Sequence, residues 1–363
     1  MKPGGVRRRG LGVLLGLACV AALRAEVRGV SHPEEEFPGD ATVVWTPVFQ
    51  AGWDAMNRQL GGTPRKCSNR LAAKLDRFEW QAAEVLPEGR WRAWSGPATA
   101  EFFGRVDREA AEFLGGEAGP FQPVEGRPGG VAFYALLDAE LAFWRPFHRS
   151  RKVAMAFHGA GGETRRVHFW GVRGEESADF NDSVRVLGWR PSLGCHAVQL
   201  RCLGGTDETL VLFRPPEPQD FATACRWVRT WRRAWRPRPE QANRAGDPAL
   251  HAHDTLRVPY LVLQAEADFK DRLQGLREYA GRDEFVLSAA RQRVDFELHE
   301  RGARARVAAE GGADPFGAPP QGFPRDFSYD RPFFVFLWRD QAEWPYFGAW
   351  IGDAAAMHAW SPE

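Results

Sequence analysis

Residues 327–340, FSYDRPFFVFLWRD, join a turn to an almost unbroken apolar run. Asp330 and Pro332 mark the turn, and residues 333–338 carry aromatic and aliphatic side chains. An apolar run of this length beside a turn signal predicts a strand that is buried on both faces. A second run, residues 346–351 (YFGAWI), predicts another such strand. The chain is therefore expected to end with two strands in the core of a sheet.

The composition is that of a large folded protein. The 363 residues are 44% hydrophobic and 12% aromatic, with a formal net charge of +1. This supplies ample apolar material for a core, so most of the chain is expected to be ordered. The sequence contains no Ser/Gly-rich linker and no fixed-period repeat that would divide it. The near-neutral charge gives no electrostatic reason to expect nucleic acid as a partner.

Residues 1–25 predict a secretory signal peptide. Three arginines, residues 7–9, precede the apolar run 11–23, which is too short to span a bilayer. We expect cleavage after about Ala25 and an extracellular or periplasmic protein. Lipid attachment at Cys19 is the alternative, although the Gly-Leu-Ala before it fits an attachment signal poorly.

The pattern changes from helical to strand periodicity along the chain. Apolar residues recur at three-to-four spacing in residues 69–85 and 98–114, whereas strand patterns begin at Val131. This order is typical of an α+β fold with large, mostly antiparallel sheets, not of an alternating βαβ fold. Further helices are expected at residues 47–62, 221–235 and 268–276, and strands at 131–144, 152–158, 165–172, 197–202, 209–213, 260–264 and 294–300.

The sequence has no G-x-S-x-G, H-E-x-x-H or P-loop pattern. The glycine cluster at residues 159–162 lacks the helix that a phosphate-binding loop requires, and it predicts a hairpin turn. His251, His253 and Asp254 offer metal-ligand chemistry, but nothing nearby completes a four-ligand shell, so an exposed loop before a strand is favoured. We expect a protein that is not an enzyme and needs no cofactor or metal.

Four cysteines remain after removal of the signal peptide: Cys67, Cys195, Cys202 and Cys225. Cys195 and Cys202 are seven residues apart on a predicted strand, and an odd separation places their side chains on opposite faces. This spacing does not favour a disulfide between them. Buried free thiols are the favoured interpretation, and the disulfide state stays open.

Residues 226–238 combine tryptophans with arginines. Trp227, Trp231 and Trp235 share one helical face, which predicts packing against the core. The arginines on the remaining surface favour an ordinary solvated face, and a sulfated polysaccharide or another polyanion is the alternative. These arginines are Arg226, Arg229, Arg232, Arg233 and Arg236.

Residues 294–312, VDFELHERGARARVAAEGG, begin as a strand and continue as an alternation in which one set is small. The alternation then enters a Gly/Pro-rich segment instead of a partner strand. A strand with such small residues on one face leaves room for close packing on that face. The small set is Ala303, Ala305, Val307 and Ala309, and the other set includes Arg304 and Arg306.

Taken together, these segments resemble the serpins. Residues 327–340 and 347–353 are similar to the family's closing signature, in which Phe precedes an Asp/Asn-Arg/His-Pro-Phe turn and two buried strands. Upstream, Glu300-Arg301-Gly302 is similar to the Glu-Glu-Gly that opens the hinge of the serpin reactive loop. The order of further similar segments agrees over roughly residues 43–353: Thr46-Pro47, Trp144-Arg-Pro-Phe147, residues 258–263 and residues 267–273.

The resemblance implies a serpin-like α+β fold with an exposed reactive loop at about residues 302–326. It implies a single domain at residues 43–363, after an N-terminal extension at 26–42. In serpins a target serine protease cleaves the loop and stays attached, and the hinge then inserts into the main sheet as a new strand. The hinge residues implied here are Glu300, Gly302, Ala303, Ala305, Val307 and Ala309.

Insertion would bury the small set and leave Arg304 and Arg306 outside. Small groups enter a sheet without overpacking, whereas a buried arginine would cost several kcal/mol, so the alternation is compatible with insertion. The alternative is a plain edge strand whose arginines discourage pairing with another chain.

The resemblance also implies a scissile bond. Counting the family's usual seventeen residues from Glu300 places cleavage between Phe316 and Gly317, which implies a chymotrypsin-like target protease and action as a monomer. Arg325 is the alternative for a trypsin-like protease, although it lies close to Phe327, which belongs to the closing signature.

Two departures from the family pattern leave a second function open. The region between Gly62 and Val131 is shorter than in serpins, so fewer helices are expected beside the main sheet. Phe49, Leu136 and Gln292 stand where serine, asparagine and histidine are usual at the sheet centre. The alternative to a secreted inhibitor is a non-inhibitory serpin-fold protein that binds a polyanion through the arginines of residues 226–236.

Overall fold

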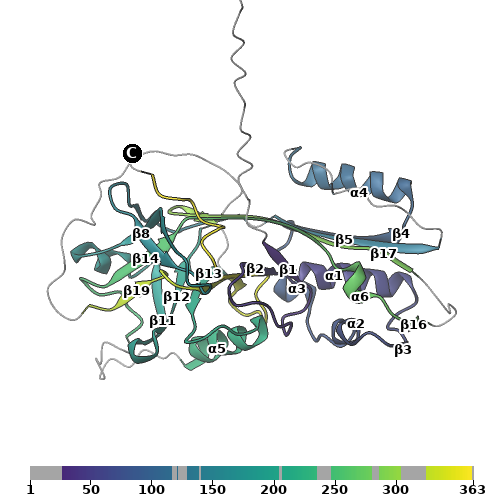
Figure 1. The fold of residues 1–363 in the computed structure, drawn as a ribbon, viewed down its shortest axis with the longest axis horizontal. Coiled ribbons are helices and arrows are strands. Elements are labelled where there is room, and N and C mark those ends of the chain that lie inside the picture. Colours follow the sequence, from purple (N-terminus) through teal and green to yellow (C-terminus); the bar gives the residue numbers. More distant parts are fainter. Residues whose placement is uncertain are drawn as a thin grey trace, which may run out of the picture.

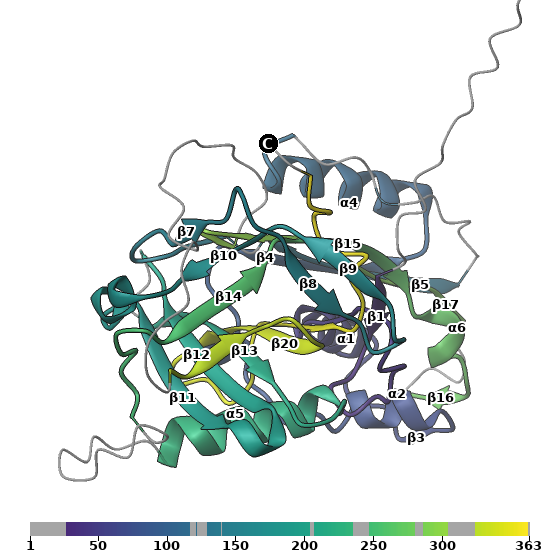
Figure 2. The same cartoon turned by 60° about the vertical axis from the view of Figure 1, so that its left-hand side comes forward.

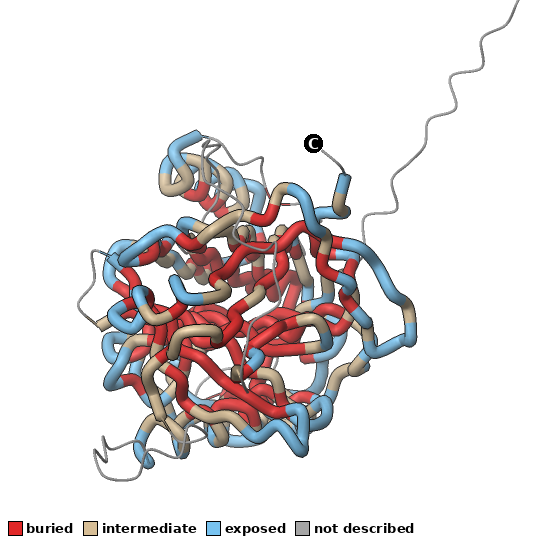
Figure 3. The backbone as a smooth tube through the Cα atoms, turned by 90° about the vertical axis from the view of Figure 1, so that its left-hand side faces the viewer, coloured by how far each residue is buried: buried red, intermediate tan, exposed pale blue. Residues whose placement is uncertain are grey.

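The computed structural model describes residues 27–116, 121, 129–138, 140–203, 207–234, 247–279, 286–303 and 324–361, so the predicted signal peptide lies outside it. These residues form a seven-stranded, a six-stranded and a four-stranded sheet, with helices on their faces. In Figure 1 the six-stranded main sheet runs toward the right, and the other two sheets fill the left half. Buried residues run through the molecule (Figure 3), and the described ones form three hydrophobic clusters.

The seven-stranded sheet contains the two strands predicted at the C-terminal end, and both are confirmed. β20 (Phe333–Arg339) pairs antiparallel with β21 (Phe347–Ile351), and both are buried apart from Arg339. The strand order is β1 (Arg28–Val30), β2 (Val43–Trp45), β21, β20, β13 (Glu208–Arg214), β12 (Cys195–Arg201) and β11 (Val184–Arg190).

The N-terminal segment contributes to this sheet. β1 lies within the predicted extension at residues 26–42, and it pairs in parallel with β2 from Arg28 opposite Val43 to Val30 opposite Trp45. The packed structure therefore begins before Val43.

Helix α5 (Phe221–Ala234) packs on the seven-stranded sheet through its predicted aromatic face (Figure 2). The Phe213 ring lies 6.1 Å from Trp227 and 5.7 Å from Trp231. Gly188 permits this approach, because a Cβ at its position would lie 2.6 Å from the Trp231 ring. Core packing by Trp227 and Trp231 is confirmed, and Trp235 lies outside the described residues.

The main sheet has the order β4 (Trp91–Pro97), β5 (Gly130–Asp138), β17 (Val286–His299), β18 (Gly302–Ala303) and β6 (Leu141–Ala142), with β15 (Leu261–Asp268) also paired to β17. β17 is much longer than the predicted strand at 294–300. β5 and β17 are parallel, whereas β4 is antiparallel to β5 and β15 is antiparallel to β17.

Helices cover both faces of the main sheet (Figure 1). α1 (Val48–Gln59) lies on one face and buries Phe49, Trp53 and Met56. α4 (Ala100–Phe113) lies on the other face, and its buried residues are Phe102, Val106 and Ala110 at intervals of four. That spacing is one helical stripe, as the sequence predicted.

The four-stranded sheet has the order β19 (Asp326–Ser328), β14 (Thr255–Pro259), β10 (Phe169–Val172) and β7 (His148–Arg149). β8 (Met155–His158) and β9 (Thr164–Val167) form a hairpin, which confirms the turn at residues 159–162. A small two-stranded sheet pairs β3 (Lys66–Cys67) with β16 (Arg277–Glu278). The short helices are η1 (Glu175–Phe180), η2 (Pro191–Leu193) and α6 (Lys270–Leu273).

The single helix predicted at residues 69–85 is wrong. The chain instead forms α2 (Arg70–Leu75) and α3 (Ala82–Val85), separated by a non-helical segment. Tertiary contacts hold that segment, since Phe78 packs 5.1 Å from the Trp344 ring and Trp80 Nε1 donates to Asp54 Oδ2 at 3.0 Å. Within the described part of the chain, no helix is both long and apolar enough to cross a membrane.

The four cysteines among the described residues are free thiols. Cys195, Cys202 and Cys225 are buried, and Cys67 is half-buried. Burial raises the pKa of Cys195 to about 11 and that of Cys202 to about 12, so both remain protonated at neutral pH. The preference for buried free thiols is confirmed for these three residues.

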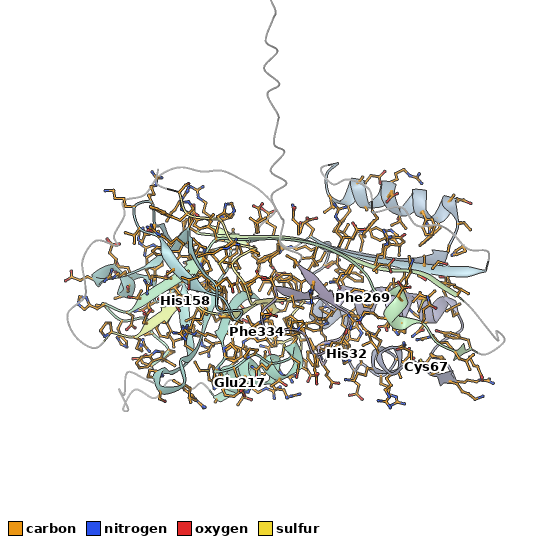
Figure 4. All side chains as sticks on the ribbon, in the orientation of Figure 1. His32, Cys67, His158, Glu217, Phe269 and Phe334 are labelled. Carbon is orange, nitrogen blue, oxygen red and sulfur yellow. The ribbon has the colours of Figure 1, made fainter. Side chains whose placement is uncertain are left out.

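The aromatic centre of the seven-stranded sheet is expected to dominate its stability. Phe334 is fully buried, and its ring lies 4.8 Å from Trp350 and 5.5 Å from Phe221 (Figure 4). Phe334→Ala should lower the free energy of unfolding by about 3–5 kcal/mol, because it leaves a cavity. Denaturant unfolding measures the loss. The exposed control Leu193→Ala should change it by less than about 0.5 kcal/mol, and equal effects would contradict this account.

Candidate functional site

The candidate site is a two-residue strand at one end of the main sheet. After β17 the chain turns at Glu300 and Arg301 and returns as β18, which lies between β17 and β6. On one side Ala303 pairs with Leu298 and Gly302 with His299. On the other side Gly302 pairs with Ala142 and Ala303 with Leu141. The start of the predicted hinge therefore already occupies a strand position inside the sheet.

Gly302 is required by the close approach of β6. Its φ is +149°, and a Cβ there would lie 1.9 Å from the carbonyl oxygen of Leu141. No side chain fits this space without moving the β6 backbone. The following residue, Ala303, is fully buried, so it takes an inward position.

The turn before β18 is held by side chains and by backbone. Glu300 O accepts from Phe147 N at 2.8 Å, and Arg301 O accepts from Phe143 N at 2.7 Å. The hydroxyl of Tyr260 donates to Glu300 Oε2. The hinge is thus fixed at the amino-terminal end of the loop.

Beyond β18 the sheet is closed. β5 and β17 pair directly from Gly130 opposite Val286 to Asp138 opposite Asp295. After Asp138 the chain no longer pairs with β17 and continues to β6, so β18 can lie between β17 and β6. In the register of β18, Glu297 and Phe296 of β17 come next, and a strand that continues beyond them would have to separate β5 from β17.

At the sheet centre Gln292 lies among apolar side chains. Phe49 lies 5.0 Å from the Phe133 ring and 4.7 Å from the Phe269 ring, and Leu136 is buried under α4. Gln292 faces Ala135 across the β5–β17 junction and is 2% exposed. Its Oε1 has no hydrogen-bond partner among the described residues. A buried unsatisfied acceptor destabilises the closed sheet.

The face under α4 is a small aromatic layer. Tyr134 lies 6.2 Å from the Phe102 ring and 4.9 Å from the Phe121 ring, and burial raises its pKa to about 12. Trp94 Nε1 donates to Glu109 Oε2 at 2.7 Å, which ties α4 to β4. In the described part of the chain, α4 is the single helix that connects β4 to β5 along the sequence.

Arg325 is buried, so its alternative role as the scissile residue is wrong. Its side chain is 0% exposed, and it donates to Asp254 Oδ2 from Nε at 3.0 Å and from Nη2 at 2.6 Å. A protease cannot bind a side chain held in this way. The same contacts correct the expectation of an exposed loop at residues 251–254, because Asp254 is 1% exposed.

The strand that follows Arg325 packs on a buried histidine. His196 of β12 lies 5.8 Å from the Phe327 ring and 4.9 Å from the Tyr329 ring. Burial lowers the pKa of His196 to about 3, so the imidazole is neutral in the folded protein.

Two of the arginines on α5 form ion pairs with nearby carboxylates. Arg229 pairs with Glu343, and Arg232 pairs with Asp340 at 2.5 Å. Arg226 and Arg233 are exposed. Arg236 lies outside the described residues, as do Ala305, Val307 and Ala309 of the hinge and Phe316 and Gly317 of the predicted scissile bond, which therefore stay predictions.

Comparison with known proteins finds no matching family model and no matching curated protein. The fold is nevertheless similar to solved structures. Mouse protein-Z-dependent protease inhibitor has 13% identity and a TM-score of 0.57 over 86% of this chain and 91% of its own. The thermophilic serpin tengpin, in its native state, has 8% identity and a TM-score of 0.56 over 91% of this chain and 98% of its own.

This chain has the serpin fold. Thyroxine-binding globulin in complex with thyroxine shares it, with 12% identity, a TM-score of 0.56, and coverage of 86% of this chain and 93% of its own. The serpin fold therefore occurs both in a protease inhibitor and in a hormone-binding protein. At these identities the likeness establishes the fold alone, and the function has to be inferred from the residues of the site.

The unsatisfied amide oxygen of Gln292 should make the native protein less stable than a variant with an apolar side chain of the same length. Gln292→Met keeps the side-chain length and removes the unsatisfied acceptor, so the free energy of unfolding should rise by about 1 kcal/mol. Thermal or denaturant unfolding measures the gain. Gln264→Met, at an exposed position of β15, is the matched control and should give no comparable gain. Destabilisation by Gln292→Met would contradict the assignment.

His196 should make the fold sensitive to acid. Its folded pKa of about 3 lies below the ordinary 6.5, so between these values the unfolded chain binds a proton that the native protein does not. This contribution to stability is complete above pH 6.5 and falls by about 1.4 kcal/mol per pH unit below it. His196→Phe should remove that slope from unfolding curves measured at several pH values. The exposed control His158→Phe should retain it, and an unchanged slope in His196→Phe would contradict the assignment.

Proposed function

We propose that this protein is a secreted inhibitor of serine proteases that acts once per molecule, by loop cleavage and strand insertion. The observation that carries the proposal is the position of β18. Gly302 and Ala303 lie between β17 and β6, at the head of the junction that an inserting strand must open. The chain continues from Ala303 into the segment that the resemblance to serpins implies is the reactive loop.

The strand directions favour extension of β18. β18 runs antiparallel to both of its neighbours, and β5 and β17 are parallel to one another. A strand that continues β18 between them would replace one parallel pairing with two antiparallel pairings. Antiparallel pairs are slightly more stable per residue, and the new strand adds hydrogen bonds along its whole length. Insertion is therefore a downhill step once the loop is free to move.

The side chains predicted to follow Ala303 fit that step. Since Ala303 faces inward, strand alternation gives the next inward positions to Ala305, Val307 and Ala309. Arg304 and Arg306 take the outward positions. The inserted face would then contain only small groups, which a closely packed sheet accepts without overpacking.

For the target we propose a chymotrypsin-like protease that cleaves between Phe316 and Gly317. This rests on the residue count from Glu300 and on the exclusion of Arg325 by burial. The protein acts on the protease as a stoichiometric partner and supplies no catalytic residue of its own.

A second candidate function is binding of a polyanion. Arg185, Arg229, Arg232 and Arg233 line a surface cavity of about 290 Å³ between α5 and the end of β20. Asp340 lines the same cavity and balances part of this charge. Such binding would be strongly salt-dependent, and it is compatible with either an inhibitory or a non-inhibitory protein.

The inhibitor is tested by incubation with chymotrypsin and with trypsin, followed by denaturing electrophoresis. We expect a band at the summed mass with chymotrypsin, and a rise in thermal midpoint of the loop-cleaved protein. Phe316→Arg should transfer complex formation to trypsin. Cleavage of the loop without a complex and without a rise in midpoint would contradict the proposal.

A matched pair of variants separates insertion from simple cleavage. Ala305→Arg places a charged group at an inward position, so complex formation should fall at least tenfold while cleavage continues. Ala308→Arg places the same residue at an outward position and should leave complex formation within about twofold of the wild type. The stoichiometry of inhibition measures both. Equal effects of the two variants would show that inhibition does not depend on the alternation of inward and outward positions in the hinge.

A further inference from the structure

A cavity of about 690 Å³ on the seven-stranded sheet plays no part in the proposed function. Sites that hold small organic molecules have volumes of roughly 300–1,000 Å³, so this cavity is large enough for one. Its floor is formed by β11, β12 and β13, which are neighbours in the sheet, and α5 packs next to β11 (Figure 2). The amide and charged residues that line it are Asp182, Arg185, Gln199, Arg201, Glu208 and Asp340.

The floor places four polar side chains within reach of one ligand. Arg185 of β11 lies opposite Gln199 of β12, and Arg201 of β12 lies opposite Thr209 of β13. Gln199 and Arg201 are two residues apart on one strand, so their side chains leave the same face of the sheet. Paired positions lie roughly 4.5–5.5 Å apart at Cβ, and a small molecule spans that distance.

Gln199 gives the strongest indication that a ligand binds. It is 9% exposed, and its Oε1 has no hydrogen-bond partner among the described residues. A buried polar atom without a partner is unfavourable, and here it belongs to a side chain that lines a cavity. The terminal torsion of glutamine is broad, so the amide can turn its oxygen or its nitrogen toward a ligand. A hydroxyl group can pair with either atom, because it both donates and accepts.

Trp144 supplies an aromatic wall. It is 44% exposed, although tryptophans are highly buried on average. Its Nε1 donates to Asp182 Oδ2 at 3.2 Å, and the Arg201 guanidinium lies 4.0 Å from the ring centroid. The ring is therefore held in place while much of it stays accessible. An accessible, fixed aromatic ring offers a flat apolar surface on which the C–H face of a ligand can stack.

Asp182 can bind a ligand in addition to holding this ring. Besides Trp144 Nε1, its carboxylate accepts from Ser183 Oγ, which donates to Oδ1 at 2.8 Å. An ionised carboxylate has about four acceptor positions, so donors of a ligand can use the remaining ones.

The charges around the cavity nearly cancel. Glu208 Oε2 pairs with Arg90 Nη1 at 3.0 Å, and Asp340 Oδ1 pairs with Arg232 Nη2 at 2.5 Å. Four arginines therefore face three carboxylates, which leaves no strong field to attract a charged ligand. The remaining charged residues in this count are Asp182, Arg185 and Arg201.

The polar groups surround the cavity instead of following one edge of it. They come from the residues before β11, from β11, β12 and β13, and from the residue after β20. A saturated ring with hydroxyl groups around its rim can pair with all of these sides, whereas a flat heteroaromatic base offers polar atoms in its own plane only. The combination of an accessible aromatic ring with amide, carboxylate and guanidinium groups therefore favours a sugar.

We propose that this cavity binds a neutral saccharide. Trp144 stacks on the sugar ring, and Gln199, Asp182 and Arg201 pair with its hydroxyl groups. The inference is independent of the proposed inhibition, because none of these residues belongs to the hinge or to the predicted reactive loop. Since the ligand has no charge, added salt should change its affinity by less than about twofold, whereas a polyanion on the α5 arginines would be displaced.

The ligand class is tested on the intact protein with a panel of small probes. The saccharides are cellobiose, diacetylchitobiose, lactose and maltose, and the controls are adenosine and a sulfated heparin disaccharide. Isothermal titration calorimetry and saturation-transfer NMR at millimolar concentration measure binding, which does not depend on a protease. At least one neutral disaccharide should bind, at low and at high salt alike. Binding of none of them, or of the two controls alone, would overturn the proposal.

Two variants and their matched controls assign the binding to this cavity. Trp144→Ala and Gln199→Met should each weaken binding of the disaccharide at least tenfold. Trp360→Ala removes another tryptophan that has an arginine over its ring, Arg166 at 4.2 Å, and Gln264→Met makes the same amide change at an exposed position. Both controls should leave the affinity unchanged. Binding that persists in Trp144→Ala and in Gln199→Met would show that the sugar binds elsewhere and would overturn the site.

Near-ultraviolet circular dichroism verifies that each variant folds. Trp144→Phe covers the case in which the alanine variant does not, because it keeps an aromatic ring and loses the hydrogen bond to Asp182 Oδ2. Its affinity should fall between those of the wild type and Gln199→Met. An affinity equal to that of the wild type would contradict the role of the fixed indole ring.

Discussion

The parallel pairing of β5 with β17 is the contact on which the proposed mechanism depends. It closes the main sheet directly below β18, and it is flanked by antiparallel pairs, β4 with β5 and β15 with β17. An incoming strand must break this pairing along its length before it gains its own. The closed sheet therefore opposes insertion, and β18 marks the point at which an inserting strand would begin.

The two large sheets differ in the composition of their interiors. The seven-stranded sheet has an aromatic interior built on β20 and β21, and nothing in the proposed mechanism requires it to move. The main sheet carries Gln292, whose Oε1 is unsatisfied, at its centre, and α4 covers one face through a stripe of three buried residues. The proposed mechanism therefore requires a change of strand pairing in the main sheet alone.

The sequence predicted the elements with strong local signals. The apolar runs of β20 and β21, the tryptophan stripe of α5 and the glycine turn between β8 and β9 were all identified. β4 was missed because Arg92, Gly96 and Pro97 weaken its strand pattern, and its place is set by pairing with the buried β5. The Arg325–Asp254 pair was missed because it joins residues 71 apart in a region without periodicity. The register of β18 also depends on tertiary packing, so the sequence could suggest the hinge but not its first two inserted residues.

The most direct measurement is a crystal structure of the loop-cleaved protein. In the uncleaved structure Ala135 and Gln292 are paired neighbours, which corresponds to a strand spacing of about 4.8 Å. The account predicts that after cleavage a new strand beginning at Gly302 lies between them and doubles this spacing to about 9.6 Å. A cleaved structure in which Ala135 still pairs with Gln292 would contradict strand insertion.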